Sequence, residues 1–319
     1  IMQIGGGLNH LFDVPNNNST KILITILMVA IFLGSSLTGL NHGVKWLSNF
    51  NIILGAVLLI FILVFGDLKF ILESYTLAIS DYLQHFIEYS LRVNPYSGDD
   101  SWIQQWTVFY WAWVISWSPF IGGFVARVSR GRTIREFVVG VLIIPPLISF
   151  TWIAGFGGTA IKLALNHNDK LVHIVDKDYT VALFELLSHF PLSEVTSSLA
   201  IVLIFIFIVT SADSTTHIVA GMATGGAINP SLKHKVLWGL LIGAISVAMT
   251  IAGGLKSLQT ASVITGLPFS IILLLMIFSL MRALKREPIH HFKMTSIDDE
   301  KDYSISLEER EKQDEQENQ

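Results

Sequence analysis

Long stretches without a single charged residue dominate this chain of 319 residues. No Lys, Arg, Asp or Glu occurs in seven runs, at 22–43, 46–66, 102–126, 137–161, 195–212, 236–255 and 257–281. Each such run predicts a membrane-spanning helix, because about 20 apolar residues cross the hydrocarbon core of a bilayer. A soluble protein can bury one helix of this kind, but seven exceed an ordinary core. The sequence therefore predicts an all-α integral membrane protein.

The composition agrees with this interpretation. Only 14% of the residues are charged and 51% are hydrophobic, whereas soluble domains usually carry about 25% charged residues. The absence of cysteine excludes disulfide bonds and thiolate metal sites. The chain begins at Ile1, without an initiator Met, inside the hydrophobic segment IMQIGGGLNHLF. We therefore expect the chain to be the C-terminal part of a longer membrane protein.

The distribution of basic residues predicts which loops face the cytoplasm. The expected spans are 1–12 (the end of a helix), 20–42, 50–66, 104–126, 136–160, 195–222, 236–254 and 262–283. The densest basic cluster is RVSRGRTIRE at 127–136, and cytoplasmic loops collect Lys and Arg. If the loop at 127–136 is cytoplasmic, successive loops alternate between the two sides of the membrane. The loops at 67–103 and 161–194 are then outside and the C-terminus is inside. The expected location is the plasma membrane, with a multi-pass transmembrane domain over 1–286.

Two segments differ from the spans. Residues 68–91, within the outer loop 67–103, have apolar residues at helical spacing that charged residues interrupt, which predicts an amphipathic helix at the outer interface. The alternative is a ninth span. Residues 287–319 end in EEREKQDEQENQ and predict a disordered, charged cytoplasmic tail.

The segment WTVFYWAWVISWSPFIGGF is the densest aromatic element. Tyr110, Trp113 and Trp117 recur at i, i+3 and i+7 and so share one helix face, which Phe120 and Phe124 extend. Such a face can serve helix packing alone. It can also form an aromatic cage, whose ring faces attract a cation that has no proton to lose.

Three residues on this segment are expected to interrupt its helix. Ser116, Ser118 and Pro119 follow one another closely at a depth well inside the span. Broken helices at mid-membrane depth free backbone carbonyls for ions in transporters. We therefore expect a helix break here.

The segment FIFIVTSADSTTHIVAG places hydroxyls and a carboxylate inside another span. Asp213 is accompanied there by the hydroxyl residues Thr210, Ser211, Ser214, Thr215 and Thr216. The carbonyl of Phe207 lies one turn before Thr210 and Ser211. Hydroxyls in membrane helices often only bond back to the preceding turn. An intramembrane Asp is more costly and marks a functional candidate, and hydroxyl and carbonyl oxygens suit a small cation such as sodium.

These motifs together identify a family. The stretch WTVFYWAWVISWSPFIGGFVARVSRGRTIREF, with GVKWLSNFN, TSADS and GGLKSLQTASVITGLPF, closely resembles the betaine/choline/carnitine transporter family. The resemblance implies twelve spans with a LeuT-like core of two inverted five-helix repeats. It implies that this chain holds about eight of the twelve transmembrane helices, from the fifth span onward.

The resemblance also implies a site. The family's tryptophan box holds the trimethylammonium head of the substrate, here through Tyr110, Trp113 and Trp117, with Val114 where the family usually has Trp. In sodium-coupled members, the residues matching the Phe207 carbonyl, Thr210 and Ser211 bind one sodium, and the residue matching Phe120 lies near a second. Asp213 and Ser214 are expected to support the ion site, and no other metal or cofactor is expected.

The leading hypothesis is a sodium-driven symporter that imports glycine betaine or a related quaternary ammonium osmolyte by alternating access. Sodium coupling is favoured because the spans at 46–66 and 102–126 carry no fixed positive charge. The alternatives are a choline or carnitine carrier and an osmosensor or scaffold that does not transport. An enzyme is not expected, because the sequence has no HExxH, GxxxxGK[ST] or GxSxG motif. The expected partners are the solute, sodium and lipid, with a homotrimer implied by the resemblance and no nucleic acid.

Overall fold

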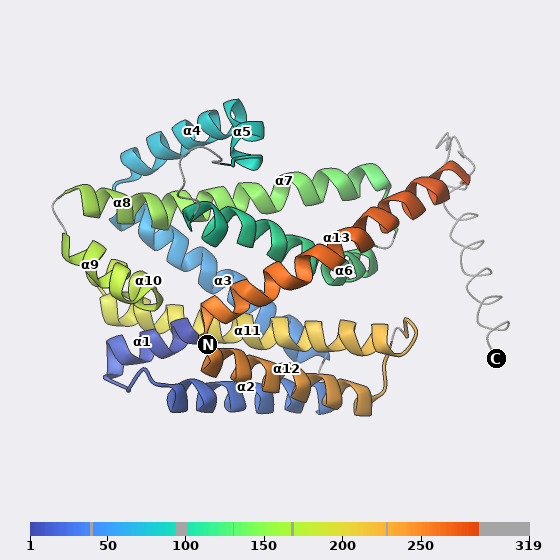
Figure 1. The fold of residues 1–319 in the computed structure, drawn as a ribbon. Coiled ribbons are helices and arrows are strands. Elements are labelled where there is room, and N and C mark those ends of the chain that lie inside the picture. Colours follow the sequence, from blue (N-terminus) through green and yellow to red (C-terminus); the bar gives the residue numbers. More distant parts are fainter. Residues whose placement is uncertain (39–40, 94–100, 130, 167–168, 228, 287–319) are drawn as a thin grey trace, which may run out of the picture. The chain divides into compact units, whose positions relative to one another are not determined.

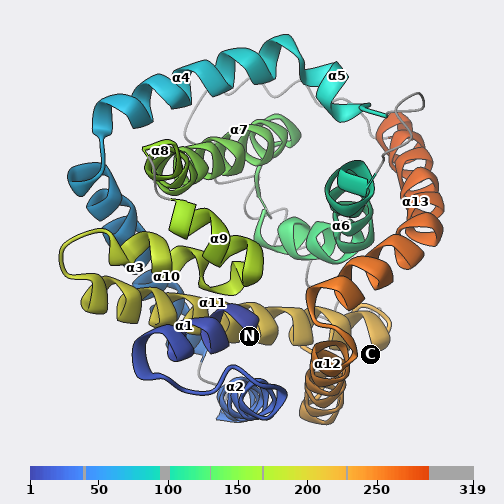
Figure 2. The same cartoon turned by 60° about the vertical axis from the view of Figure 1, so that its left-hand side comes forward.

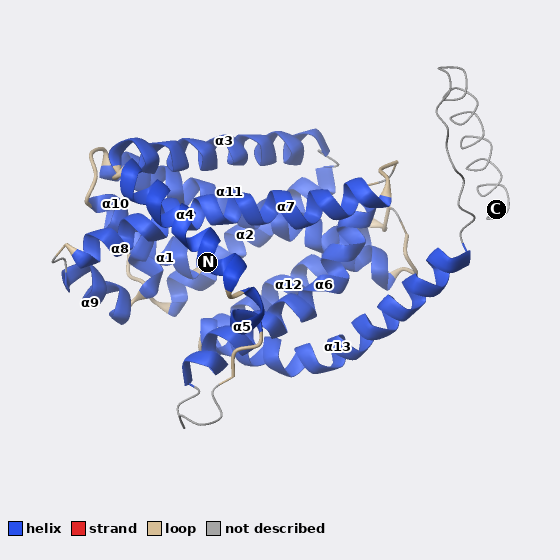
Figure 3. Cartoon of the chain, turned by 90° about the horizontal axis from the view of Figure 1, so that it is seen from above, coloured by secondary structure: helices blue, strands red, loops and turns tan. Residues whose placement is uncertain are grey.

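The computed structural model describes residues 1–38, 41–93, 101–129, 131–166, 169–227 and 229–286. All regular elements in this described part are helices, which confirms the all-α prediction (Figures 1 and 3). In chain order they are α1 (Met2–Phe12), α2 (Asn18–Thr38), α3 (Asn41–Phe65), α4 (Leu68–Gln84), α5 (Phe86–Ser90), η1 (Ile103–Val108), α6 (Phe109–Val128), α7 (Ile134–Trp152), η2 (Ile153–Gly157), α8 (Gly158–Leu165), α9 (Asp169–Lys177), η3 (Tyr179–Val181), α10 (Ala182–Ser188), α11 (Ser193–Ala223), α12 (Leu232–Ala252) and α13 (Leu255–Arg286). The chain divides into two units, Ile1–Ser270 and Ile271–Gln319. The contacts below belong to the first unit, and the described part of the second is the C-terminal half of α13.

Seven helices are long and apolar enough to cross a membrane, and they coincide with the seven charge-free runs. They are Asn18–Ser35, Trp46–Phe65, Ile103–Ala126, Ile134–Leu165, Ser193–Ala223, Leu232–Ala252 and Leu255–Arg286. The multi-pass membrane prediction is thus confirmed. With 11 residues, α1 is too short to cross a membrane.

The segment 68–91 is helical, as predicted, and forms α4 and α5. Neither helix is among the seven apolar spans of the described residues, and the ninth-span alternative stays open. The place of α4 at the outer interface stays a prediction. The other long segment predicted to lie outside, 161–194, is more regular than a loop, because it contains α9, η3 and α10.

Local sequence signals set several helix ends. Asp67 accepts a hydrogen bond from the Phe70 N–H, 3.0 Å away, and so begins α4. Thr133 and Glu136 form a reciprocal capping box that begins α7. The turn between α12 and α13 requires glycine, because Gly253 has φ 139° and Gly254 has φ 61°.

Two spans contain a π-helical segment. η1 precedes α6, and η2 connects α7 with α8. A π turn accommodates one additional residue and turns the following side chains to a new direction. In each of these spans, the side chains before and after the π-helical segment therefore do not follow a single repeat of about 3.6 residues per turn.

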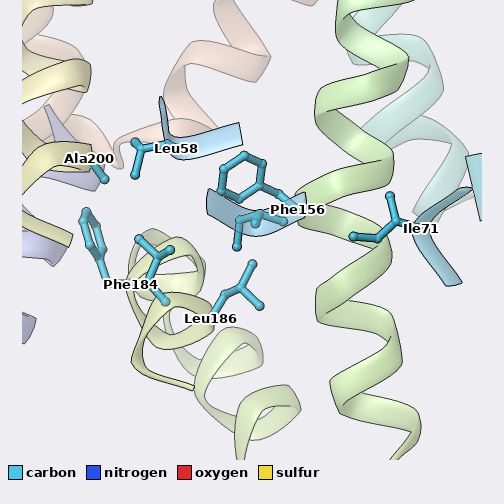
Figure 4. Close-up of a cluster of buried hydrophobic side chains, with 8 residues drawn as sticks. Leu58, Ile71, Phe156, Phe184, Leu186 and Ala200 are labelled. Carbon is cyan, nitrogen blue, oxygen red and sulfur yellow. The ribbon is translucent and has the colours of Figure 1, made fainter. Parts of the chain in front are cut away.

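The main hydrophobic cluster joins the short helix α10 to the spans, as Figure 4 shows. Phe184 and Leu186 of α10 pack with Leu58 of α3, Phe156 of η2 and Ala200 of α11. The Phe184 and Leu187 side chains are completely buried. The cluster fixes α10 and η2 against α3 and α11.

Glycines allow close packing elsewhere. A Cβ atom at Gly239 or Gly243 of α12 would collide with Leu33 or Val29 of α2, and α2 and α12 lie side by side (Figure 2). On α1, Gly7 leaves room for the ring of Phe184. Small residues bring helices together in membranes, where no hydrophobic force drives helix association.

Helix α4 is held at two places. Asp67, at its start, forms an ion pair with Lys162 of α8. The ammonium group of Lys162 also lies 5.1 Å from the centroid of the Phe70 ring. Near the other end of α4, the rings of Tyr82 and Phe150 of α7 meet edge to face with centroids 5.5 Å apart.

Some predictions concern residues outside the described part. These are the disordered tail at 287–319 and Arg130 of the basic cluster. That the basic cluster and the C-terminus lie on the cytoplasmic side of the membrane stays a prediction.

Candidate transport site

The aromatic face predicted on α6 is present in the structure. Tyr110 and Trp113 meet edge to face with ring centroids 5.9 Å apart, and Trp113 and Trp117 follow at 6.3 Å. Trp106 of η1 stacks on Tyr110 at 6.3 Å and extends the row. Trp113 and Trp117 are 42% and 48% exposed, so their ring faces are accessible to a ligand.

The predicted break in this helix is wrong, because α6 runs from Phe109 to Val128 with Pro119 inside it. Ser116 donates its hydroxyl hydrogen to the Ala112 carbonyl at 2.7 Å, and Ser118 donates to the Val114 carbonyl at 2.5 Å. Both serine hydroxyls thus bond to the turn before them within a continuous helix. The irregular part of this span is instead η1, at its N-terminal end.

Two hydroxyls of the predicted ion site on α11 bond to the backbone of their own helix. Thr210 Oγ1 donates to the Ile206 carbonyl at 2.9 Å and to the Phe207 carbonyl at 3.1 Å, while Ser214 donates to the Thr210 carbonyl at 3.0 Å. These bonds use the hydroxyl hydrogens and leave oxygen lone pairs available. Thr210 and the Phe207 carbonyl, both predicted ion ligands, are thus adjacent.

A cavity of 250 Å³ brings part of the predicted site together. It lies among α3, α6 and α11. Its lining residues are Ser48, Trp117, Ile121, Phe124, Thr210, Ser211, Ser214, Thr215 and Ile218. One wall therefore carries an indole ring and another carries hydroxyl groups, and no charged residue of the described chain lines the cavity. Hydroxyl oxygens fit a small hard cation, and the ring fits an organic one.

A second cavity, of 350 Å³, adjoins the first through Trp117 and is almost wholly apolar. Phe120 and Trp238 also line it, from α6 and α12. Phe120 makes a further ring contact with Phe269 of α13 at 6.0 Å. Because Trp117 lines both cavities, it forms part of the wall that they share.

The structure separates the predicted residues into two groups. Trp117, Thr210, Ser211 and Ser214 line the hydroxyl-bearing cavity, and Phe120 lines its apolar neighbour. The other predicted residues line neither cavity. They are Tyr110, Trp113, Val114, Asp213 and Phe207, whose carbonyl oxygen is the predicted sodium ligand. The binding roles of all these residues stay predictions.

Sequence reasoning missed Ser48 and Trp238, which also line these cavities, and it placed Thr215 in the hydroxyl cluster without giving it a role in the site. Trp238 carried a signal, since it is a tryptophan inside a charge-free run. Ser48 carried none, because its position depends on how α3 packs against α11.

Comparison with known proteins places the chain among transporters. The model of the betaine/carnitine/choline family transporters matches residues 1–289. An ectoine/hydroxyectoine transporter of Virgibacillus pantothenticus is 49% identical over 90% of the chain and 57% of that protein. The glycine betaine transporter of Bacillus subtilis is 42% identical over 89% and 55%, and the osmo-independent choline transporter of Acinetobacter baylyi is 37% identical over 88% and 55%.

These relatives are transporters rather than enzymes, which agrees with the expectation that the chain is not an enzyme. The chain spans a little over half the length of each of the three. The family match and the helical fold are consistent with a partial LeuT-like core.

Proposed function

Because the chain belongs to the betaine/carnitine/choline transporter family, we propose that its protein imports a small quaternary ammonium osmolyte, with glycine betaine as the leading substrate. The observation that carries the proposal is the cavity shared by Trp117 and the α11 hydroxyls. A permanent cation keeps its charge in any site. Ring faces therefore stabilise it without the cost of burying a carboxylate.

We further propose that sodium drives this import. The supporting observation is the group of uncharged oxygens from Thr210, Ser211 and the Phe207 carbonyl. Hydroxyl and carbonyl oxygens can replace part of the hydration shell of a hard cation. Sodium would favour the conformation that binds the solute only if its affinity for that conformation is higher.

Ectoine is the second candidate substrate. The 49% identity to an ectoine/hydroxyectoine transporter supports it. The small side chain of Val114, which lies next to Trp113 on α6 and is 47% exposed, also supports it. An aliphatic side chain offers less ring surface than the expected Trp and so weakens a cage for a trimethylammonium group. A flat, delocalised cation can instead stack on one indole.

The test is uptake by the reconstituted protein with and without a sodium gradient. Labelled glycine betaine, ectoine, choline and carnitine are compared at equal concentrations. We expect sodium-dependent uptake of betaine or ectoine in preference to choline and carnitine. Uptake that is indifferent to sodium would disprove the coupling. No uptake of any of these solutes would favour the sensor or scaffold alternative. The homotrimer can be tested separately by the mass of the purified protein–detergent complex.

A further inference from the structure

A groove that shares no lining residue with the two cavities of the candidate transport site has the two chemical parts of a phospholipid site. It has a volume of 580 Å³ and lies among the segment after α5, the span formed by η1 and α6, and the first half of α13. Its floor is mainly apolar and includes Val108, Ile115, Val263 and Leu267, while Arg92 lies on its lining at the chain segment that follows α5.

The packing of η1 and α6 against α13 gives the groove its length. Gln259 Nε2 donates to the Gln105 carbonyl at 3.2 Å, and Gly266 leaves room for Ala112 further along. The two helices therefore run in the same direction beside each other. The lining residues of this span reach from Ile103 to Ile115, which corresponds to about 18 Å at a rise of about 1.5 Å per residue. This length suits a large part of one acyl chain.

Arg92 supplies the polar part. Its guanidinium carbon lies 5.9 Å from the centroid of the Trp102 ring, and none of the ion pairs among the described residues includes it. Trp102 and Trp106, at the start of the span, are 59% and 42% exposed. Exposed Trp side chains at a span end are typical of the lipid head-group level. A guanidinium held there presents a planar set of donors that matches a phosphate group.

We propose that this groove binds an anionic phospholipid, with one acyl chain along α6 and α13 and the phosphate group at Arg92. Ser90 and Thr107, which also line the groove, add hydroxyl donors for the head group. The charged side chain nearest in sequence on the same segment is Glu88, one turn before Arg92, and it forms no ion pair with Arg92 within the described residues. The guanidinium charge therefore selects an anionic head group over a zwitterionic one.

The test is native mass spectrometry of the purified protein titrated with phosphatidylglycerol or phosphatidylcholine of the same acyl chains. We expect the wild-type protein to retain phosphatidylglycerol in preference. Arg92→Gln should weaken this retention roughly tenfold, because a charge-assisted hydrogen bond is lost. Leu267→Trp should weaken retention of both lipids by filling the groove.

Matched controls are Lys69→Gln, which removes an exposed positive charge from α4, and Leu237→Trp, which adds the same ring to an exposed position of α12. Neither should change retention. Arg92→Lys keeps the charge without the planar donors and should give an intermediate loss. Size-exclusion profiles identify any variant that fails to fold, and the head-group and groove variants test the proposal independently.

Equal retention of the two lipids by the wild-type protein would overturn the proposal, as would an Arg92→Gln variant that binds like Lys69→Gln. Displacement of phosphatidylglycerol by millimolar inorganic phosphate would assign Arg92 to a free anion and would also overturn it.

Discussion

The indole rings of Trp113 and Trp117 lie on one face of α6 with centroids 6.3 Å apart and planes inclined by 32°. Only Trp117 also lines the hydroxyl-bearing cavity. The row of rings thus leads along α6 to the place where the proposed solute and ion sites meet. We therefore expect the loss of Trp117 to affect solute uptake more than the loss of any other ring in the row.

Replacement of Trp117 by Ala should raise the KM for solute uptake by about two- to thirtyfold, the range expected for loss of a cation–π contact. Trp117→Phe keeps a ring and should retain part of the affinity. The matched control is Trp46→Ala, which removes an exposed tryptophan that stacks on Phe50 of α3. Equal effects of the Trp117→Ala and Trp46→Ala changes would contradict the assignment.

Removal of the Ser211 hydroxyl should raise the sodium concentration that gives half-maximal uptake and leave the maximal rate at saturating sodium less affected. The reason is that Ser211→Ala removes one oxygen donor while the cavity keeps its shape. Ser48→Ala should act in the same direction, since Ser48 lines the same cavity from α3.

Ser246→Ala is the control for both serine variants. Its hydroxyl donates to the Ile242 carbonyl of α12 at 2.8 Å and lines neither cavity. The ion assignment fails if the sodium dependence of Ser211→Ala matches that of Ser246→Ala.

Gly7→Ala should lower the thermal stability of the purified protein, because a methyl group at this position meets the buried ring of Phe184. Overpacking of this kind costs about 1–3 kcal/mol. Gly140→Ala on α7 is the control, since nothing lies within 4 Å of a Cβ atom there. That change should leave stability unchanged or raise it by up to about 1 kcal/mol.

The ion pair between Asp67 and Lys162 should weaken in acid. The hydrogen bond from Lys162, with a further one from the Phe70 N–H, lowers the pKa of Asp67 below its usual 3.8. A lowered carboxyl pKa means that the stabilisation is present above the unfolded-state pKa and is lost as pH falls through the folded-state pKa. The window of loss therefore lies below pH 3.8.

A double-mutant cycle of Asp67→Asn and Lys162→Gln, read as melting temperatures, measures this coupling. We expect non-additive effects at neutral pH and additive effects once Asp67 is protonated. Additivity at both pH values would show that the pair contributes nothing measurable.

The spans were predictable from sequence because charge is so costly in a bilayer that its absence marks each one. The aromatic face of α6 was predictable because the spacing of Tyr110, Trp113 and Trp117 falls within one regular helix. The expected break at Pro119 was wrong because α6 is continuous from Phe109 to Val128, and the irregular part of the span is η1 at its N-terminal end.

Features that depend on tertiary contacts could not be predicted. The π-helical segments η1 and η2 have no residue signature of their own. Ser48 reaches the cavity only because α3 packs against α11.

The two attachments of α4 have a mechanical consequence. One fastens Asp67 to Lys162 of α8, and the other sets Tyr82 against Phe150 of α7. Since α7, η2 and α8 form one continuous span, both contacts fix α4 to the same span. A tilt of that span would therefore displace α4 in the same direction. A force on α4 would likewise be transmitted to the span through both contacts.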